Sequence, residues 1–420
     1  MKKKKIFVIV LTLILLGILA ISIYIYNENR KEQIRLDKIK KEEELVKEIT
    51  SHYNEFVKTS NDAILYNDNN EEVGKIASGI ELSLDEIKID KDTRYFKVKD
   101  FENIYIKYDD VEKIESLSII DSRYKNYILY NEDIVTKEVT NFYTEDDSLI
   151  YTFNRSFDLP IIVKETNKYG IEYNGRLLYV KNEDVLNIKE NINSNAEKAN
   201  SIRVIAYHAF YDKNVKEESW CRTSICHSTE QIESHAKYIS DNNYFTLNMK
   251  ELEMFIDGKI NLPRKSLVIT IDDGLLAERG IEILNNFKLN ATVFLVTSYY
   301  KPENFIQYEY IEFHSHGHNI HNVGQCPGGQ GGGVKCLEKT ALQLDLKTSR
   351  DILNGSTVFC YPFYEYNNYA IDNLKEAGFT MAFAGLIGNG KATVGINKYL
   401  IPRYTINNTT TVNQLSNIIK

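Results

Sequence analysis

Four of the chain's eight histidines lie within eight residues, in the segment YIEFHSHGHNIHN at 310–322. Imidazole nitrogens are common ligands of zinc and related metals, and two imidazoles plus one carboxylate leave coordination positions open for water. Such a site is typical of metal-dependent hydrolases. A single histidine after a strand is usually structural, but so dense a cluster is better explained by metal binding. The residues alone leave two pairs open, His316 with His321 and His314 with His318.

A second polar motif supplies carboxylates. The sequence TIDDG at 270–274 follows a β-branched run, and Gly274 permits a tight turn at its end. Of two adjacent carboxylates, one can bind a metal while the other stays free as a base. Asp-Asp-Gly is also an ordinary turn sequence, so the catalytic hypothesis depends on whether Asp272 and Asp273 meet the histidine cluster.

The sequence predicts that a parallel sheet positions these side chains. Over 201–420, strands with nearly continuous apolar runs alternate with amphipathic helices. Such strands are typical of a parallel sheet that is covered on both faces. The pattern predicts an α/β domain with a distorted or incomplete (β/α) barrel. Active sites of such barrels lie at the C-terminal ends of the strands, where His208, Asp272 and the histidine cluster are expected.

The two motifs together resemble those of the NodB-homology polysaccharide deacetylases, carbohydrate esterase family 4. The resemblance covers roughly residues 201–410. The family's first motif is Thr-Phe-Asp-Asp-Gly, in which the first aspartate is the general base and the second binds the metal. The resemblance therefore implies that Asp272 is the base and that Asp273 is a metal ligand.

The second motif of the family joins an acidic residue, a Ser-His pair and a later histidine. Glu312, Ser315 with His316, and His321 match this order. The spacing resembles that of the exopolysaccharide, or poly-N-acetylglucosamine, deacetylase branch. The resemblance thus implies that Asp273, His316 and His321 hold the metal, in preference to the rival histidine pair.

A third segment, YPFYEYN at 361–367, resembles the Tyr-Pro-aromatic segment of the same branch. In the family the backbone N–H after the proline binds the oxyanion, which implies Phe363 here. Tyr364 is expected to narrow the pocket. His314, His316 and His318 would share one face of an extended strand, so His318 is expected to line the pocket without binding the metal.

The sequence departs from the family pattern in three places. No arginine precedes the proline in VFCYP, and Arg403 in IPRYTI is the candidate to orient Asp272 instead. Tyr364 stands where a glycine often follows the aromatic residue. The family's late histidine, which protonates the leaving amine, has no counterpart after His321. His208 is the expected substitute, and the alternative is a histidine that bonds the backbone.

The resemblance implies metal-dependent N-deacetylation of a sugar, with release of acetate. Two imidazoles and a carboxylate suit zinc, and cobalt, nickel or iron are alternatives. The first substrate expected is N-acetylglucosamine in a cell-wall polymer, namely peptidoglycan. The alternative is a secreted poly-N-acetylglucosamine exopolysaccharide. A protein of another class, which binds polysaccharide on an inactive deacetylase fold, also stays open because the late histidine is missing.

The first 60 residues indicate attachment to a membrane. A cationic tail at 1–5 precedes an uncharged run at 6–26, whose length as a helix would span about 30 Å. The run does not end in a small-x-small cleavage site, which favours an uncleaved anchor over a cleaved signal. The lysines place the N-terminus in the cytoplasm. We therefore expect a single-pass cell-membrane protein with an extracellular catalytic domain and a charged helical stalk at 27–60.

Two similar segments follow, at 61–120 and 121–190. IYIKYDDVEKI in the first resembles LLYVKNEDVLNI in the second, and short β-prone runs alternate with turn residues in both. The rhythm predicts two small all-β domains similar to bacterial Src-homology-3-like wall-binding domains, or else a structural spacer. A polar linker at 191–200 then leads to the deacetylase domain at 201–420.

Charge and cysteine usage narrow the remaining possibilities. The net charge is -8 and no domain is basic, so nucleic acid is not an expected partner. Four of the five cysteines form two close pairs, and the two-residue spacing of a four-thiolate zinc site is absent. Disulfides Cys221–Cys226 and Cys326–Cys336 are predicted, with free thiols or crossed pairs as alternatives. The second, glycine-rich loop is expected on the rim of the active site.

Overall fold

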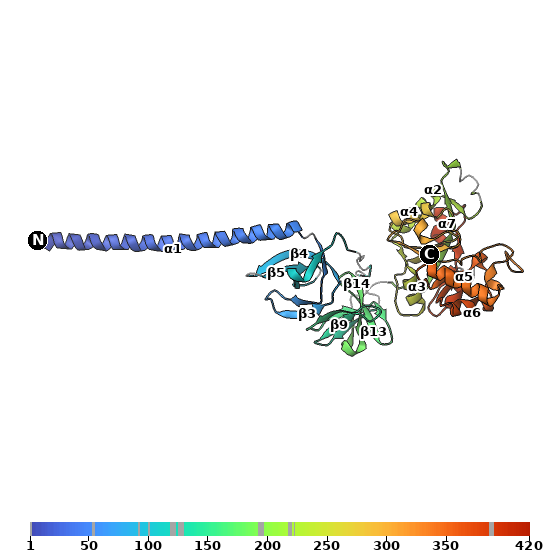
Figure 1. The fold of residues 1–420 in the computed structure, drawn as a ribbon, viewed down its shortest axis with the longest axis horizontal. Helices are drawn as coiled ribbons and strands as arrows, with labels where there is room; N and C mark the ends of the chain where they lie inside the picture. Colours follow the sequence, from blue (N-terminus) through green and yellow to red (C-terminus); the bar gives the residue numbers. More distant parts are fainter. Residues whose placement is uncertain are drawn as a thin grey trace. The chain divides into compact units, whose positions relative to one another are not determined.

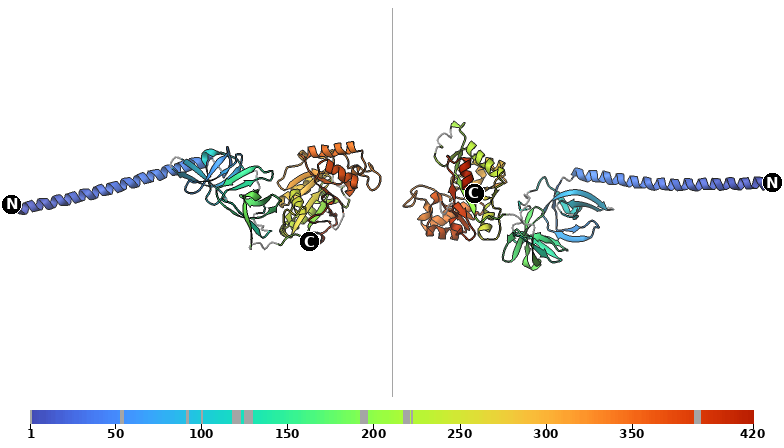
Figure 2. Two further views of the ribbon diagram at one scale, coloured as in Figure 1. Left: turned by 90° about the horizontal axis from the view of Figure 1, so that it is seen from below. Right: turned by 180° about the vertical axis from the view of Figure 1, so that it is seen from behind.

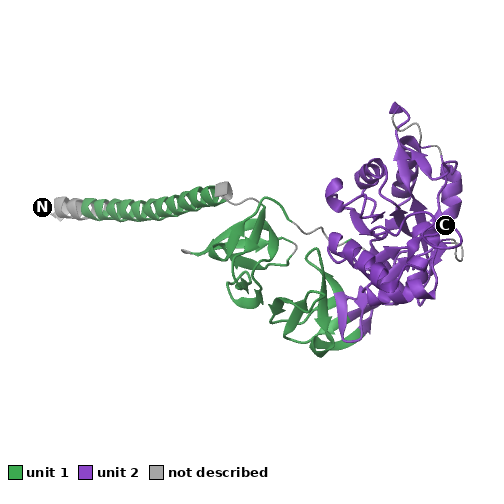
Figure 3. Ribbon diagram, turned by 45° about the vertical axis from the view of Figure 1, so that its right-hand side comes forward, with its two compact units in different colours: residues 1–125, 134–159, 171–188 green, residues 126–133, 160–170, 189–420 purple. Residues whose placement is uncertain are grey.

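The computed structural model divides the chain into two compact units (Figure 3). The first comprises Met1–Lys125, Ile134–Leu159 and Ile171–Ile188, and the second comprises Asn126–Asp133, Pro160–Gly170 and Lys189–Lys420. The residues that the structure describes are 2–52, 55–90, 93–99, 101–117, 123–124, 130–191, 197–216, 221, 223–385 and 390–420.

The first unit begins with one long helix, α1 (Lys2–His52), drawn in blue in Figure 1. The expected anchor and most of the expected stalk form this single helix, which has no proline. Its charged half is supported by pairs one turn apart, such as Lys31 with Glu28 at 2.9 Å. Its apolar half exposes side chains such as Leu13, which is 63% exposed. Among the described residues, α1 alone is long and apolar enough to cross a membrane.

Strands, most of them short, follow one another from α1 to residue 190. The first strand begins at Phe56, inside the range expected for the stalk. Its alternate residues Val57 and Thr59 bury their side chains, as expected for a strand with one face on the core. The strands are β1 (Phe56–Thr59), β2 (Ala63–Tyr66), β3 (Glu72–Ile76), β4 (Glu81–Asp90), β5 (Thr93–Val98), β6 (Tyr105–Lys107), β7 (Val111–Lys113), β8 (Glu132–Thr136), β9 (Thr140–Tyr143), β10 (Leu149–Phe153), β11 (Asp158–Pro160), β12 (Val163–Lys164), β13 (Lys168–Tyr173), β14 (Arg176–Lys181) and β15 (Val185–Glu190).

The two predicted repeats share local structure and are joined in one sheet. The 3-10 helices η1 (Tyr108–Asp110) and η2 (Asn182–Asp184) each precede a strand at the corresponding point of the two repeats. Strand β10 of the second repeat pairs with β3 of the first, with Phe153 opposite Gly74. A Cβ at Gly74 would lie 2.4 Å from a backbone oxygen, so glycine permits this close pairing.

The second unit contains the predicted parallel sheet. Its parallel strands are ordered β24–β23–β22–β21–β20–β16. Side chains along the two central strands β20 and β21 are buried throughout, as expected for a sheet covered on both faces. The bounds are β16 (Ile202–Tyr207), β20 (Ser266–Ile271), β21 (Ala291–Leu295), β22 (Ile311–Ser315), β23 (Val358–Cys360) and β24 (Met381–Phe383).

The two edges of this sheet meet through one short segment near the end of the chain. Strand β26 (Tyr404–Thr405) pairs in parallel with β16, and Ile401 forms an isolated parallel bridge with Phe383 of β24. Strand β25 (Lys391–Ala392) adds an antiparallel pairing to β16. The prediction of a distorted or incomplete barrel is confirmed in this coarser form, as a curved, mostly parallel sheet.

Helices surround this sheet (Figure 2). Ile281 and Leu284 of α4 and Ile232 of α2 belong to the same buried cluster as Ile269 and Val293 of the strands. The helices are α2 (Thr229–Asp241), α3 (Met249–Ile256), α4 (Glu278–Asn286), α5 (Lys339–Ile352), α6 (Asn368–Glu376) and α7 (Val412–Ile418). The remaining elements of the unit are β17 (Ala209–Tyr211), β18 (Cys226–Ser228), β19 (Phe245–Thr246), η4 (Pro302–Asn304), η5 (Gly333–Lys335), η6 (Pro362–Tyr364) and η8 (Lys398–Leu400).

Both predicted disulfides are present. Cys221 is bonded to Cys226 and Cys326 to Cys336, with S–S distances of 2.07 and 2.11 Å. The fifth cysteine, Cys360, is a buried free thiol. The two bridges close short local loops, and the second encloses the glycine-rich segment.

Candidate active site

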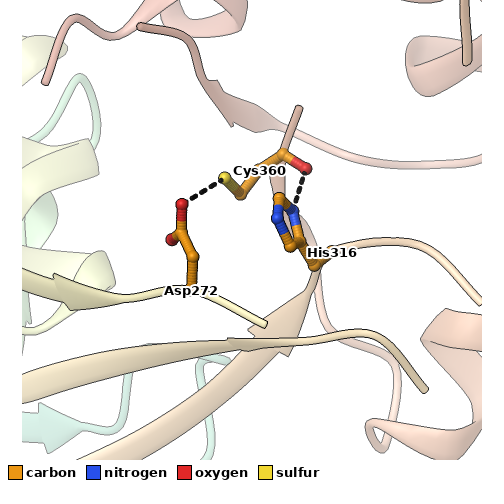
Figure 4. A group of neighbouring side chains, drawn as sticks. All are labelled: Asp272, His316 and Cys360. Atoms are coloured by element: carbon orange, nitrogen blue, oxygen red, sulfur yellow. Dashed lines mark hydrogen bonds between the residues drawn. The ribbon is translucent and has the colours of Figure 1, made fainter. Parts of the chain in front are cut away.

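The predicted chemical groups meet at one edge of the sheet. His208 follows β16, Asp272 and Asp273 follow β20, and His316 follows β22. Cys360 ends β23, and Figure 4 shows its side chain beside Asp272 and its carbonyl beside His316. Because the C-terminal ends of parallel strands lie at one edge, segments far apart in sequence contribute to one site.

Asp273, His316 and His321 come together as a possible metal site. Asp273 Oδ1 lies 3.3 Å from His316 Nε2 and 3.2 Å from His321 Nε2. The three donor atoms lie within 4.8 Å of one another. The backbone of Asp273 has φ 73° and that of Gly274 has φ 92°, so the chain turns sharply where the carboxylate is presented. One carboxylate oxygen and two imidazole nitrogens fit a divalent metal.

Neighbouring groups fix the orientation of both imidazole rings. His316 Nδ1 lies 2.8 Å from the carbonyl oxygen of Cys360, which leaves Nε2 to face Asp273. The His321 ring centroid lies 4.4 Å from that of Phe363. A hydrogen bond from the second ring nitrogen is the usual way in which proteins orient a metal-binding histidine.

The rival histidines are engaged elsewhere. His314 Nδ1 lies 2.7 Å from Ser356 Oγ, and His318 Nδ1 lies 3.1 Å from Thr297 Oγ1. The expectation that an extended strand places His314, His316 and His318 on one face is wrong. The strand ends at Ser315, and Gly317 has φ 86°, a turn in the chain that precedes His318.

The loop between the two candidate ligands is anchored to helix α5. The backbone N–H groups of His318 and Asn319 donate to the carboxylate of Asp345, at 2.8 and 2.6 Å. A Cβ at Gly317 would lie 2.4 Å from the Ile320 side chain, so the loop is also tightly packed. No motif in the sequence marks Asp345, which contacts the loop from helix α5.

Asp272 forms a buried bidentate ion pair with Arg403. The guanidinium nitrogens lie 2.6 and 2.9 Å from the two carboxylate oxygens, and Thr270 Oγ1 is a further partner of Arg403 at 3.3 Å. Burial alone would raise the pKa of Asp272, but the charge of Arg403 outweighs it and holds that pKa well below its usual range. Asp272 is therefore ionised at neutral pH.

His208 lies beside this ion pair. Its Nε2 is 3.8 Å from Asp272 Oδ2, while its Nδ1 is buried and has no hydrogen-bond partner among the described residues. The alternative of a histidine that bonds the backbone is therefore not supported. Burial lowers the pKa of His208, so the ring is neutral at pH 7.

Cys360 is the contact that sequence reasoning missed. Its Sγ lies 3.0 Å from Arg403 Nη2. The same Sγ lies 3.6 Å from Asp272 Oδ2 (Figure 4). The signal in the sequence that could have pointed to this contact is the absence of an arginine before the proline in VFCYP. Asp272, His316 and Cys360 also group closely enough to hold a metal. A cation there would face the guanidinium of Arg403, so the group that contains Asp273 is the better metal site.

Phe363 and Tyr364 adopt left-handed backbone conformations, with φ 56° and 61°. In the family a glycine often stands at the position of Tyr364. This backbone geometry explains that preference, because glycine adopts it without strain. The Tyr364 hydroxyl lies 2.8 Å from Thr405 Oγ1, and its ring lies 5.1 Å from the guanidinium carbon of Arg403. Tyr364 thus packs against the ion pair that holds Asp272.

The disulfide-closed loop contacts the same segment. The carboxylate of Glu365 accepts hydrogen bonds from the backbone N–H groups of Gln330, Gly331 and Gly332. Lys335 Nζ lies 2.8 Å from Glu365. The loop is therefore fastened to Glu365, the residue that follows Tyr364.

Comparison with known proteins gives a family match for this unit. The polysaccharide deacetylase family model matches residues 259–382, which contain the candidate site except for His208 and Arg403. A poly-beta-1,6-N-acetyl-D-glucosamine N-deacetylase of Staphylococcus aureus is 26% identical over 230 residues, covering 50% of this chain and 75% of the relative.

Two solved structures can be aligned with the chain. A de-N-acetylase from Aggregatibacter actinomycetemcomitans is 23% identical, with a TM-score of 0.44, over 52% of this chain and 99% of that one. A polysaccharide deacetylase from Bacillus cereus is 16% identical, with a TM-score of 0.42, over 81% of this chain and 99% of that one.

Proposed function

We propose that this chain is a polysaccharide deacetylase, as the family match over residues 259–382 supports, and that it removes acetyl groups from poly-β-1,6-N-acetyl-D-glucosamine in a metal-dependent hydrolysis. The observation that carries the proposal is the meeting of two groups of residues. Asp273, His316 and His321 offer a metal site, and the Asp272–Arg403 ion pair offers an ionised base beside it.

The choice of substrate rests on the relatives. The Staphylococcus aureus relative is named for poly-beta-1,6-N-acetyl-D-glucosamine. The second motif, with Glu312, His316 and His321, resembles that of the exopolysaccharide branch. Both observations favour the exopolysaccharide over peptidoglycan, which was the first expectation from the sequence.

We propose that Asp273, His316 and His321 hold one divalent metal ion. The donor set suits zinc, with cobalt, nickel or iron as alternatives. When bound, such an ion polarises the acetyl carbonyl and makes water a stronger nucleophile. The chain's own residues must then position the substrate and move the protons.

Asp272 is our proposed general base. Its carboxylate is ionised and held by Arg403, so it can take a proton from the attacking water without reorienting. His208 Nε2 lies near Asp272 Oδ2 and is neutral, so it can accept that proton and deliver it to the leaving amine. The backbone N–H of Phe363 would stabilise the oxyanion.

Tyr364 and His318 were expected to contact the substrate. Their contacts with Arg403 and Thr297 instead support a role in positioning the base and the loop that carries His321. We propose this supporting role for both.

The second candidate function is polysaccharide binding on an inactive fold. The missing late histidine favours it, whereas the buried Asp272–Arg403 pair argues against it. A buried ion pair is expensive to keep without a use for the charge. An inactive binding protein would have no such use.

Side-by-side measurement of acetate release from poly-N-acetylglucosamine and from peptidoglycan tests the proposal. We expect faster release from the former, loss of activity with a chelator, and recovery on addition of zinc. Asp273→Asn should lose bound metal, while Asp272→Asn should keep it and lose roughly 10²–10⁴-fold in turnover. Preference for peptidoglycan would restore the first expectation, and binding without acetate release would favour the inactive protein.

A further inference from the structure

The second unit has another concave surface, at the opposite ends of the strands from the candidate active site. This cavity has a volume of about 610 Å³. Arg203, the second residue of β16, and Ser266, the first residue of β20, both line it. The active-site groups follow the C-terminal ends of these two strands, so the cavity and the site are separated by the length of the sheet.

Positive charge is concentrated in this cavity although the chain has a net charge of -8. Besides Arg264, the basic residues of its lining are Lys198, Arg203, Lys265, Lys391 and Lys420. The acidic side chain in the lining, Glu197, is paired with Arg264 at 2.6 Å. The side chains of Arg203, Lys265 and Lys391 therefore have no carboxylate side chain as a partner among the residues that line the cavity, and Lys265 Nζ donates to the carbonyl oxygen of Asn242 at 3.0 Å.

Two of these cations face each other across a strand pairing. Arg203 of β16 is directly opposite Lys391 of β25 in the antiparallel register. Like charges at directly opposite positions destabilise a sheet. The Nε of Arg203 is also buried, with no hydrogen-bond partner within the described part of the chain. Burial of the guanidinium lowers the pKa of Arg203, which indicates that its charge is poorly solvated.

An anion between the two side chains would resolve both problems. It would replace the repulsion between Arg203 and Lys391 by attraction, and it would accept a hydrogen bond from the buried Nε. Phosphate fits this task because its several oxygens accept bonds from a guanidinium and an ammonium at once. Tyr238, Asn242 and Tyr244 also line the cavity, whose volume leaves room for a hydroxylated group attached to the phosphate.

We propose that this cavity is a binding site for a phosphate group, held by Arg203, Lys265 and Lys391. The source is either free phosphate or the phosphate ester of a polyol or sugar. The site is separate from the deacetylase reaction, and it would give the enzyme a contact with phosphate-bearing material around its substrate.

Calorimetric titration of the full-length protein in a neutral detergent tests this site. The probes are inorganic phosphate, glycerol 3-phosphate and, as a control, sodium acetate at matched ionic strength. Arg203→Gln and Lys391→Gln should each weaken phosphate binding at least tenfold. Lys347→Gln, an exposed lysine on α5, is the matched control and should leave binding unchanged.

Lys391 is exposed, so its variant should fold even if Arg203→Gln does not. Acetate release from a short soluble substrate should be unchanged in Lys391→Gln. Tighter binding of glycerol 3-phosphate than of inorganic phosphate would identify an ester as the source, and the reverse order would identify free phosphate. Equal responses to acetate and phosphate, or binding that Lys391→Gln does not weaken, would overturn the proposal.

Discussion

The two candidate histidine ligands differ from their neighbours in what they face. His316 and His321 both face Asp273, while His314 and His318 pair with serine and threonine hydroxyls. His316→Ala and His321→Ala should therefore lose most of the bound metal and nearly all activity. His314→Ala and His318→Ala are the matched controls and should retain the metal. Elemental analysis of the four purified variants decides, and metal loss confined to the control pair would refute the assignment.

Arg403 holds Asp272 ionised, so its removal should shift the pH dependence of kcat/KM in a defined direction. Arg403→Gln leaves the burial of Asp272 in place without the opposing positive charge, and the pKa of Asp272 should rise. The acidic limb of kcat/KM against pH should move to higher pH, because Asp272 must be ionised to act as our proposed base. Arg403→Lys keeps the charge without the two-pronged contact and should shift the limb less. An unmoved limb in Arg403→Gln would contradict this role.

The same pair affects stability. The pKa of Asp272 is lower in the folded protein than its unfolded value of about 3.9. The pair therefore stabilises the fold above that value, and this contribution is lost as pH falls through the folded pKa. Leaving Asp272 buried without its partner should cost about 3–5 kcal/mol near neutral pH. Urea unfolding of wild type and Arg403→Gln at pH 7 measures this loss.

For individual residues, the sequence predicted which side chains take part in the site better than it predicted which side chains contact one another. The motif TIDDG and the histidine spacing pointed to four residues that the structure brings together. The contact between Cys360 and Arg403 had no motif, because it depends on how two segments that are distant in the sequence pack together. The resting charge of His208 also depends on burial, which a sequence position alone does not reveal.

Among the elements, the loop from Gly317 to His321 depends on helix α5. Asp345 binds two backbone N–H groups of that loop, so Asp345→Ala should loosen His321 and weaken metal affinity by about 10–100-fold. Asp351→Ala, an exposed change on the same helix, is the control. Metal titration with activity measured at saturating metal separates the two effects. Recovery of activity at high metal is expected, and unchanged affinity would rule out the positioning role.

The glycine-rich loop is fastened twice, by the Cys326–Cys336 disulfide and by Glu365. Loss of the bridge should cost on the order of 2–3 kcal/mol of loop order. A Cys326→Ser, Cys336→Ser double variant should therefore lose more activity on polymer than on short oligosaccharide. A Cys221→Ser, Cys226→Ser double variant controls for general loss of a disulfide. Equal losses on both substrates would leave the loop with a stabilising role alone.

Element types were largely predictable and the connections between them were not. Apolar runs such as SLVITI predicted buried parallel strands, and β20 confirms this. The joining of the two β-repeats through β3 and β10 was not foreseen, because periodicity describes one strand and says nothing of its neighbour. The predicted wall-binding role of these repeats stays a prediction.

For the whole molecule, α1 is the helix that could attach the protein to a membrane. We expect it to act as an uncleaved membrane anchor, with its lysine-rich end in the cytoplasm and the deacetylase domain outside. Leu19→Lys places a charge at the centre of the apolar half, and it should shift protein from the membrane fraction to the soluble fraction. Ile34→Lys, in the charged half, is the control. N-terminal sequencing that begins beyond residue 26 would show a cleaved signal instead.

The closing segment of the sheet also affects when the enzyme becomes active. Arg403 lies between Ile401 and β26, the two contacts through which the edges of the sheet meet. Arg403, the partner of Asp272, thus comes from a segment that is synthesised after the segments that carry the histidines and carboxylates. Before that segment folds, the chain would have its histidines and carboxylates without the cation that holds Asp272 ionised. We therefore expect the site to become competent only once this segment has closed the sheet.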